Sequence, residues 1–255
     1  MKRVDIIIKE KFGLSRQKVQ QLIKEGAVTV NKQPVKKPSQ TAEETDEIEI
    51  ADNTDTLRYA GRGGLKLEGA LGSFGLDIGG RICIDIGAST GGFTDCMLQN
   101  GAKCVYSVDV GTAQLARGLR DDSRVHCFEN TNIKDFVCDE AADFIAADVS
   151  FVSLEKIFPE IDRLLCGGCA VVLVKPQFEA GREHLSKNGI VRDIKVHKNI
   201  LKRLVSAAAA HGLYCTGLVP SPIKGGDGNT EYLMLLERTP ADTDISALIK
   251  QAVGQ

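Results

Sequence analysis

Hydrophobic residues along the chain follow two different patterns. Beyond residue 64, short apolar runs alternate with longer segments in which apolar positions recur every three or four residues. Short runs are typical of buried strands and the longer segments of helices, so this part predicts a doubly wound α/β sheet. The strands are expected at 82–86, 104–110, 143–149, 170–174, 215–220 and 232–237, with helices starting at Leu65 and over 199–211.

The first 57 residues predict a smaller α+β fold. Residues 4–12 have the pattern of a short helix, and Ser15 is placed to cap a second helix that Gly26 ends. Strand-like residues follow at 28–30, from Val35 onward and at 48–50. The patterns divide the chain into a small domain over 1–57, a glycine-rich connector over 58–64, the α/β domain over 65–238 and a tail over 239–255.

Charge is distributed unevenly, although the formal net charge of the 255 residues is only −2. Residues 1–38 carry ten Lys/Arg and three Asp/Glu, whereas residues 39–57 carry seven acidic residues and no basic one. A block with a net charge of +7 is typical of a polyanion binder. A basic surface that is merely solvated is the alternative.

The sequence lacks the features of membrane and secreted proteins. No apolar run approaches the roughly 20 residues that span a bilayer, and no signal-peptide core follows the first residues, so we expect a cytoplasmic protein. The eight cysteines are scattered, as reduced core thiols are. Cys166 and Cys169 form a lone CxxC without a second pair, so we expect a turn there and no metal site.

A glycine-rich turn follows the first strand of the α/β domain. The stretch from Ile82 to Thr94 is Ile-Cys-Ile-Asp-Ile-Gly-Ala-Ser-Thr-Gly-Gly-Phe-Thr. Its glycine spacing differs from the Gly-x-Gly-x-x-Gly of dinucleotide folds, and no Lys-Ser or Lys-Thr follows as in a triphosphate loop. The pattern favours the first loop of an S-adenosylmethionine methyltransferase over a plain strand-to-helix turn. The candidate cofactor residues are Asp85, Gly87, Ser89, Gly91, Gly92, Phe93 and Thr94.

Charged residues follow the next strands, at the edge where α/β folds bind ligands. Asp109 is placed to bind the ribose hydroxyls of a nucleoside cofactor, and Asp135 lies where an adenine amino group is usually met. Asp148 and Lys175 end the following strands, although each alone is equally consistent with a solvated strand-end charge. The segment Asp148–Phe151 lacks the double proline of amino methyltransferases and any cysteine nucleophile nearby. A lysine at a strand end suits removal of a proton from a hydroxyl.

The N-terminal part resembles a known RNA-binding module. Residues 15–35 are similar to the S4-like domain first seen in a ribosomal small-subunit protein. The resemblance implies that basic residues on a helix bind structured RNA, mainly through phosphate and shape contacts. The residues that would do so are Arg16, Lys18, Lys24, Lys32 and Arg62.

Four segments resemble the TlyA group, a family named as haemolysins and related to the FtsJ-type ribose methyltransferases. They are 62–67, 85–94, 173–179 and 228–233, and with the N-terminal module the resemblance extends to about Arg238. It implies a Rossmann-like class I methyltransferase sheet with a small N-terminal α+β RNA-binding domain. It also implies an enzyme that uses S-adenosyl-L-methionine to methylate the 2′-hydroxyl of cytidine in ribosomal RNA, with the RNA or a ribosomal subunit as partner.

The family's Lys-Asp-Lys-Glu tetrad would fall here on Lys66, Asp148, Lys175 and Glu231. In that interpretation Lys175 is the base, Lys66 steadies the developing alkoxide, and the carboxylates orient the lysines, with Asp148 also beside the cofactor. An ion-pair network at the sheet edge is the structural alternative. Two other functions stay open. One is a catalytically silent ribosome-binding factor, and the other is a membrane-lysing protein, as the family name suggests.

Overall fold

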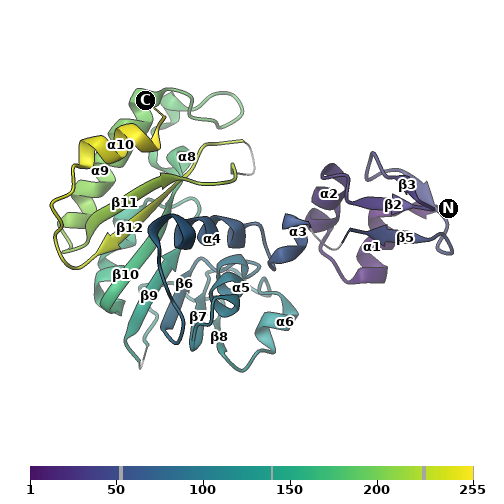
Figure 1. Ribbon diagram of the computed structural model, residues 1–255, viewed down its shortest axis with the longest axis horizontal. Helices are drawn as coiled ribbons and strands as arrows, with labels where there is room; N and C mark the ends of the chain where they lie inside the picture. Colours follow the sequence, from purple (N-terminus) through teal and green to yellow (C-terminus); the bar gives the residue numbers. More distant parts are fainter. Residues whose placement is uncertain (52–53, 139, 226–227, 255) are drawn as a thin grey trace. The chain divides into compact units, whose positions relative to one another are not determined.

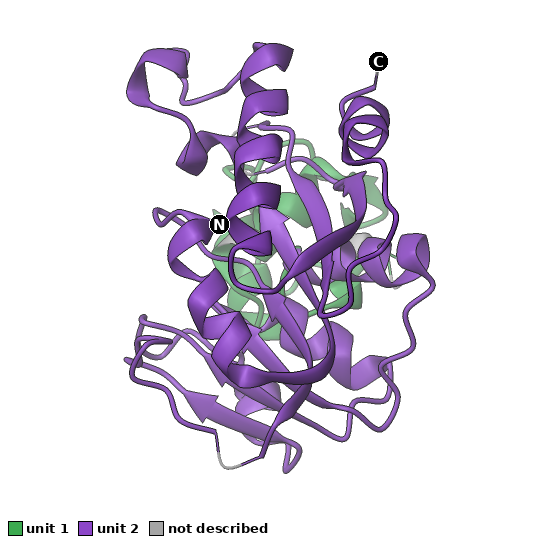
Figure 2. Cartoon of the chain, turned by 90° about the vertical axis from the view of Figure 1, so that its left-hand side faces the viewer, with its two compact units in different colours: residues 1–62 green, residues 63–255 purple. Residues whose placement is uncertain are grey.

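The chain forms two compact units that each bury a hydrophobic core of their own. The computed structural model describes residues 1–51, 54–138, 140–225 and 228–254. The N-terminal unit is Met1–Arg62 and the α/β unit is Gly63–Gln255, and Figure 2 colours them separately.

The N-terminal unit packs two helices against short strands. Its elements are β1 (Lys2–Arg3), α1 (Val4–Phe12), α2 (Arg16–Lys24), β2 (Val28–Val30), β3 (Gln33–Pro34), β4 (Thr41–Ala42), β5 (Ile48–Ile50) and α3 (Asp55–Arg58). The strands form a β3-β2-β5 sheet and a β1-β4 pair, both antiparallel. Val4 and Ile8 of α1, Val19 and Leu22 of α2, and Val28 of β2 are fully buried in the core of this unit.

Both predicted helices of the N-terminal unit are confirmed. The Ser15 hydroxyl caps α2 by accepting the backbone N–H of Lys18 at 3.2 Å, and Gly26 follows the helix with a φ of +71°. The strands predicted at β2 and β5 are also confirmed. The strand expected from Val35 is wrong: β3 spans Gln33–Pro34 and ends before Val35, because a tight two-residue turn connects β2 directly to Gln33.

A sheet of seven described strands forms the centre of the α/β unit (Figure 1). The strands are β6 (Ile82–Ile86), β7 (Cys104–Val108), β8 (Val125–Phe128), β9 (Ala142–Ala147), β10 (Leu165–Val174), β11 (Tyr214–Pro220) and β12 (Tyr232–Glu237). Their order is β11-β12-β10-β9-β6-β7-β8, and β12 runs antiparallel to both of its neighbours. Because β6 lies between β7 and β9, the strand order changes direction there, and the predicted doubly wound fold is confirmed.

Helices cover both faces of this sheet. They are α4 (Gly63–Phe74), α5 (Gly92–Gln99), α6 (Arg117–Arg120), α7 (Phe158–Leu164), α8 (Pro176–Glu179), α9 (Ile194–Ala209) and α10 (Ile245–Ala252), with 3-10 turns at Leu154–Lys156 and Arg182–His184. Helices α4 and α5 pack together on one face, and α7, α9 and α10 share the core on the other (Figure 1). Within the described residues, no helix has both the length and the apolar character needed to cross a membrane.

Two strands differ from the sequence pattern. β8 is an edge strand with both buried and exposed residues, so it lacks the continuous apolar run that marks the other strands. β10 begins at Leu165, earlier than expected, because a bulge lets the strand continue through Gly167 and Gly168. The CxxC segment therefore lies within this bulged strand, where we expected a turn before the strand.

Two helices also extend beyond the expected pattern. α9 begins before residue 199 because the Asp193 carboxylate caps it, accepting the N–H of Lys195 at 2.8 Å. The tail, for which the sequence offered no function, contributes α10. Its residues Ile249 and Ala252 are buried in the same core as α7 and α9, so the tail is part of the α/β unit.

The cysteines are mainly core residues. All eight are free thiols, and those with buried side chains include Cys83 and Cys215. Burial raises the pKa of Cys83 to about 12 and that of Cys215 to about 11, so both thiols are protonated near neutral pH.

Ile249→Ala should destabilise the α/β unit, because truncating a buried isoleucine typically costs about 2–5 kcal/mol. The neighbouring Lys250 is exposed, so Lys250→Ala should leave stability nearly unchanged. Urea unfolding curves of the two variants measure the difference. Equal midpoints would show that α10 does not contribute to the folded core.

Candidate active site

A cavity of about 400 Å³ opens at the carboxyl edge of the sheet, beside the point where the strand order changes direction. Its apolar walls come from Val110, Ile133 and Ile157, and two carboxylates, Asp109 and Asp148, also line it. Open α/β sheets bind their ligands at this position, so the cavity is the candidate cofactor site.

The loop after β6 is shaped by close contacts with the protein itself. Gly87 has a φ of +85°, and a Cβ there would lie 2.7 Å from the backbone oxygen of Asp148. Gly91 has a φ of +94° and caps α5, which Gly92 begins, and a Cβ on Gly91 would clash with the Leu119 side chain. Both glycines are predicted cofactor residues, and at both positions the space that a Cβ would occupy is filled by protein atoms.

Three predicted cofactor residues lie behind the loop. Asp85 is fully buried, and its Oδ2 accepts the N–H and the hydroxyl of Thr94 at 2.8 and 2.6 Å. The Thr94 hydroxyl also contacts the Ser107 hydroxyl at 2.7 Å. Phe93 is buried beside Gly63 of α4. Burial raises the pKa of Asp85 to about 7, so this residue supports the loop as a carboxyl group that is partly neutral near pH 7.

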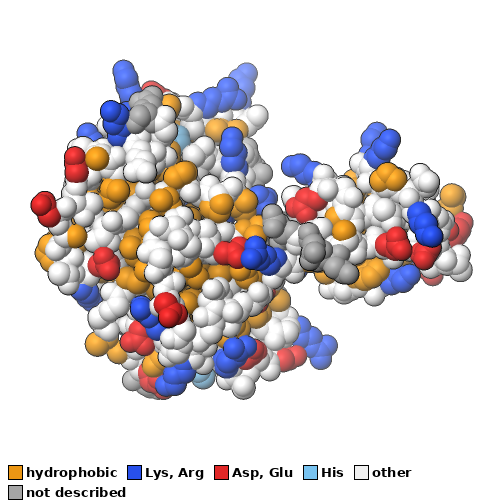
Figure 3. Space-filling view, viewed as in Figure 1, with side chains coloured by type: hydrophobic (Ala, Val, Ile, Leu, Met, Phe, Trp, Pro, Cys, Tyr) orange, Lys and Arg blue, Asp and Glu red, His pale blue; other side chains and the backbone are white. Residues whose placement is uncertain are grey.

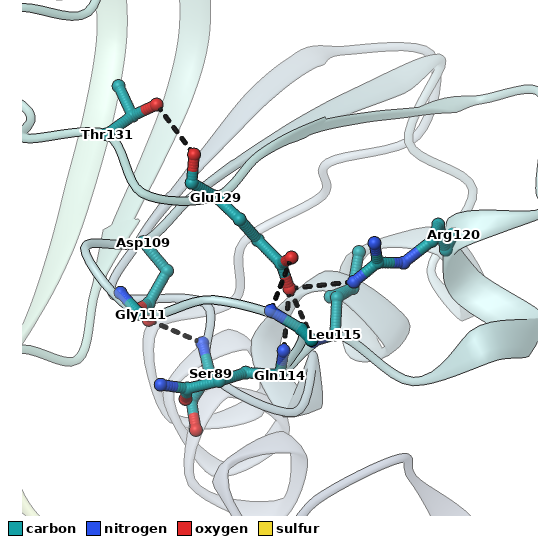
Figure 4. Close-up of polar contacts among 9 residues, drawn as sticks. Ser89, Asp109, Gly111, Gln114, Leu115, Arg120, Glu129 and Thr131 are labelled. Carbon is teal, nitrogen blue, oxygen red and sulfur yellow. Dashed lines mark hydrogen bonds and ion pairs between the residues drawn. The ribbon is translucent and has the colours of Figure 1, made fainter.

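Asp109 connects two loops at the cavity (Figure 4). Its Oδ2 accepts the N–H of Ser89 at 2.8 Å, and its Oδ1 accepts the N–H of Gly111 at 2.6 Å. A carboxylate has about four lone-pair positions, so Asp109 keeps acceptor capacity toward the cavity. Of the predicted cofactor residues, those that line the cavity are Gly87, Ser89, Asp109 and Asp148.

Glu129 fixes one wall of the cavity without lining it (Figure 4). Its carboxylate accepts the backbone N–H groups of Ala113, Gln114 and Leu115 at 2.8, 2.7 and 2.9 Å, and the Arg120 guanidinium at 2.8 Å. These hydrogen bonds lower the pKa of Glu129 to about 2, and the bond from the Leu115 N–H has the largest effect. Sequence reasoning missed Glu129 because its main partners are backbone groups, which a sequence does not display.

Asp135 is exposed and does not line the cavity. The segment that borders the cavity on this side lies just before it, at Thr131, Asn132 and Ile133. The loop that contains Asp135 therefore borders the cavity, but through residues two to four positions earlier in the chain.

The four tetrad residues form two ion pairs. Lys66 Nζ lies 2.7 Å from Glu231 Oε2, and both side chains are buried. Lys175 Nζ lies 2.6 Å from Asp148 Oδ1 and donates to the Ser150 hydroxyl at 2.8 Å. The contact to Asp148 is an ion pair without the alignment of a hydrogen bond. Asp148 is 19 % exposed and lines the cavity, whereas Glu231 is 2 % exposed. The two lysine side chains are similarly exposed, at 10 % for Lys66 and 11 % for Lys175, so the Asp148 carboxylate is what opens the second pair to the cavity.

Two contacts connect these ion pairs. Gln177 lies on α8, directly after β10, and its Nε2 donates to Glu231 Oε1 at 3.1 Å. Gly63 lies in the first turn of α4, where a Cβ would be 3.6 Å from Asp148 Oδ2. Residues that are far apart in the sequence therefore meet at one edge of the sheet, as the resemblance implied.

Phe151 is an exposed aromatic residue beside the Lys175–Asp148 pair, and the sequence did not predict it as a site residue. It is 89 % exposed, lines the cavity and has a φ of +62°. Its ring centroid is 4.7 Å from that of Phe178, and Lys175 Nζ is 5.7 Å from the Phe178 centroid. A positive φ is strained for a bulky residue, and such strain is typical of functional sites.

The predicted RNA contacts of the N-terminal unit differ in their surroundings. Lys18 is half-buried, and its Nζ donates to the backbone oxygen of Tyr59 at 3.0 Å, so this lysine helps to hold the end of the unit. The predicted contacts with exposed side chains are Arg16, Lys24, Lys32 and Arg62.

Comparison with protein families decides the relationship. A model of FtsJ-like methyltransferases matches residues 59–238. The chain belongs to the FtsJ-like methyltransferase family. A model of the S4 domain matches residues 2–48, within the N-terminal unit. Both the expected family and the expected RNA-binding module are therefore confirmed.

Named relatives match most of the chain. A Bacillus subtilis protein with the provisional name rRNA methyltransferase YqxC is 48 % identical over 241 residues, which is 92 % of this chain and 85 % of the relative. The 16S/23S rRNA (cytidine-2′-O)-methyltransferase TlyA of Mycobacterium tuberculosis is 36 % identical over 255 residues, 96 % of this chain and 92 % of the relative. The solved structure of a Streptococcus thermophilus protein provisionally named hemolysin has a TM-score of 0.77 at 42 % identity, covering 98 % of this chain and 95 % of that chain.

Glu129→Gln should weaken binding of S-adenosylmethionine, the cofactor that the family implies, by about tenfold, because the bonds that hold the Gln114 wall lose the negative charge of their acceptor. Arg120→Met is the matched control, since it leaves the three backbone N–H bonds to Glu129 in place and should have a smaller effect. Calorimetry measures both affinities. A larger loss for Arg120→Met than for Glu129→Gln would contradict this assignment.

Asp85→Asn should change how stability depends on pH. The folded wild type holds a proton on Asp85 that the unfolded chain releases near pH 4, so its contribution to stability falls as the pH rises from about 4 to 7. The asparagine stays neutral and removes this part of the slope, whereas the exposed control Asp242→Asn should keep it. Urea unfolding at several pH values between about 4 and 8 measures the slopes. An unchanged slope in Asp85→Asn would show that this carboxyl group is ionised throughout.

Proposed function

We propose that the chain transfers a methyl group from S-adenosyl-L-methionine to the 2′-hydroxyl of a cytidine in ribosomal RNA. The observation that carries this proposal is the position of Asp148, which lines the cavity and also pairs with Lys175. A methyl donor in the cavity and a hydroxyl group at Lys175 would lie on either side of this one carboxylate. The choice of cytidine follows the name of the Mycobacterium tuberculosis relative.

The residues around the cavity fit this cofactor. A volume of about 400 Å³ lies in the usual range for small-molecule sites, roughly 300–1,000 Å³. Ile133 and Ile157 offer apolar walls for an adenine ring, and Asp109 has lone pairs left for ribose hydroxyls. Gln114, held in place through Glu129, completes the polar side of the cavity.

When bound, the cofactor supplies a methyl group that its positively charged sulfur makes electrophilic. Lys175 would act on the other reactant: the hydroxyl O–H bond breaks and the proton goes to Nζ. The oxygen bonds to the methyl carbon as the bond from that carbon to sulfur breaks, which leaves its electron pair on a neutral sulfur. This step requires the neutral amine at Lys175, and the Asp148 carboxylate beside it orients Nζ. The Ser150 hydroxyl, at 2.8 Å, fixes the direction of Nζ. Correct alignment of the two reactants supplies much of the rate enhancement.

The RNA substrate is bound on two kinds of surface. The S4 domain offers Arg16, Lys24 and Lys32 for phosphate contacts, with exposed side chains. In the α/β unit, the exposed ring of Phe151 offers a face on which an unpaired base can stack beside Lys175. Stacking there would hold the target nucleotide out of its helix, with its ribose toward the Lys175–Asp148 pair.

Lys175→Met should lower methyl transfer to ribosomal RNA by at least about 100-fold, because it keeps the apolar stem and removes the Nζ that takes the proton. The control is Lys103→Met. Lys103 lies directly before β7 and pairs with Glu140, and this variant should retain activity. Transfer is measured with radiolabelled cofactor on both ribosomal RNAs. Binding of S-adenosylhomocysteine, measured by calorimetry, should be nearly unchanged in both variants.

The same assay separates the rival functions. A catalytically silent ribosome-binding factor would bind ribosomal RNA without any methyl transfer by the wild type. A membrane-lysing protein would release dye from liposomes, in the Lys175→Met variant as well as in the wild type. Near-normal methyl transfer by Lys175→Met would place the base elsewhere.

A further inference from the structure

A second concentration of positive charge lies in the α/β unit. Residues 182–203 carry seven Lys/Arg and two Asp/Glu, a net charge of +5 in a chain whose total is −2. They comprise residues 182–192, which we call the basic loop, and the first turns of α9. Figure 3 shows Lys and Arg side chains gathered over the loop that follows α8.

Within the part of the chain that the structure describes, most of these charges have no counter-ion. Arg203 pairs with Glu155 and Glu179, on the side of α9 that faces α8. Five other basic side chains are exposed and have no carboxylate within 4.0 Å among the described residues: Arg182, Lys187, Arg192, Lys195 and Lys202. Positive charges gathered in this way repel one another and attract a polyanion, although a merely solvated surface would look the same.

The basic loop lies at the same edge of the sheet as the tetrad. It follows β10 through the short helix α8, whose N-cap residue is Lys175. The Ser186 N–H donates to the Ile190 oxygen at 3.0 Å, and the Ser186 hydroxyl accepts the Ile190 N–H at 3.0 Å. The loop therefore has a defined turn of its own.

Buried polar side chains hold the basic loop against β12. Asn229 is 1 % exposed, and its Oδ1 accepts the Val191 N–H at 3.2 Å while its Nδ2 donates to the Gly189 oxygen at 3.1 Å. His197 is also buried, and its ring nitrogens contact the Val191 oxygen at 3.0 Å and the Tyr232 hydroxyl at 2.8 Å.

The buried hydrogen bonds of Asn229 and His197 favour a surface that binds a ligand over one that is only solvated. Asn229 and Tyr232 flank Glu231, the carboxylate that pairs with Lys66, so the loop is fixed in register with the tetrad. Burying polar side chains costs desolvation that their hydrogen bonds must offset. Charges needed only for solubility require no such fixed position.

We propose that the basic loop, together with Lys195 at the start of α9, binds phosphates of the RNA substrate beside the nucleotide to be methylated. Asn229 and His197 are positioning residues that hold these charges in register with the tetrad. Arg192 also lines a cavity of about 420 Å³ with Thr230, which gives the surface a hollow beside the loop. The inference rests on the proposed function, because it takes RNA as the substrate.

A matched pair of double variants tests the basic loop. The loop variant combines Lys187→Gln with Arg192→Gln and removes two positive charges from the basic loop. The control variant combines Lys103→Gln with Arg124→Gln and removes two positive charges at the amino ends of β7 and β8, away from the tetrad. The full-length proteins are titrated with small- and large-subunit ribosomal RNA at several salt concentrations.

The loop variant should bind RNA about tenfold or more weakly, and its slope of log affinity against log salt should be smaller by about 1.4–1.8, since each phosphate contact contributes roughly 0.7–0.9. The control variant should match the wild type in both. Calorimetry with S-adenosylmethionine confirms an intact α/β unit in each variant. If the first loop variant fails to bind the cofactor, Lys187→Gln with Lys195→Gln takes its place.

Equal RNA affinity and equal salt slopes for the loop and control variants would overturn the inference. If the wild type then still methylates ribosomal RNA, the proposed function stands without the phosphate surface. The reverse outcome is also distinguishable. If the wild type methylates neither ribosomal RNA, the proposed function is refuted. If the loop variant nevertheless binds RNA more weakly and with a smaller salt slope, the phosphate surface is supported.

Discussion

The ion pair between Lys66 and Glu231 is the interaction on which the rest of the site depends. It joins α4, the first helix of the α/β unit, to the residue directly before β12, across 165 positions of sequence and an N–O distance of 2.7 Å. Both charges are removed from water, so neither is stable there without the other. Removing one partner of such a buried pair typically costs about 3–5 kcal/mol, because the remaining charge is uncompensated. The position of α4 relative to the sheet is therefore fixed by electrostatics as well as by packing.

The surroundings of this pair follow from its burial. A Cβ on Gly225 would lie 2.5 Å from Glu231 Oε1, so this position cannot hold a larger residue without moving the carboxylate. Gln177 donates to the same oxygen and thereby connects the pair to the end of β10, where Lys175 meets Asp148. The buried ion pair and the one at the cavity are thus linked through the end of β10. That is a physical reason for the chain to keep a charged pair where apolar residues would pack as well.

Much of the fold could be predicted because strands buried on both faces carry continuous apolar runs, whereas the edge strand β8 and the bulge in β10 carry none. The rule that ligands bind at strand ends correctly brought Asp109 and Asp148 to one cavity. It could not tell lining residues from supporting ones, so Asp85 and Thr94, which hold the loop from behind, were expected in the cavity itself. Glu129 could not be found at all, because it acts on backbone N–H groups.

The order of the strands also governs how the protein is made. β12 is the last strand in the sequence, yet it lies between β10 and β11. Domains generally fold as units while the chain is being synthesised, N-terminal first. The S4-containing unit is complete once residue 62 has emerged, but the central sheet stays open, and Lys66 lacks its partner, until Glu231 leaves the ribosome. A nascent chain can therefore fold the S4-containing unit well before it can assemble the α/β unit.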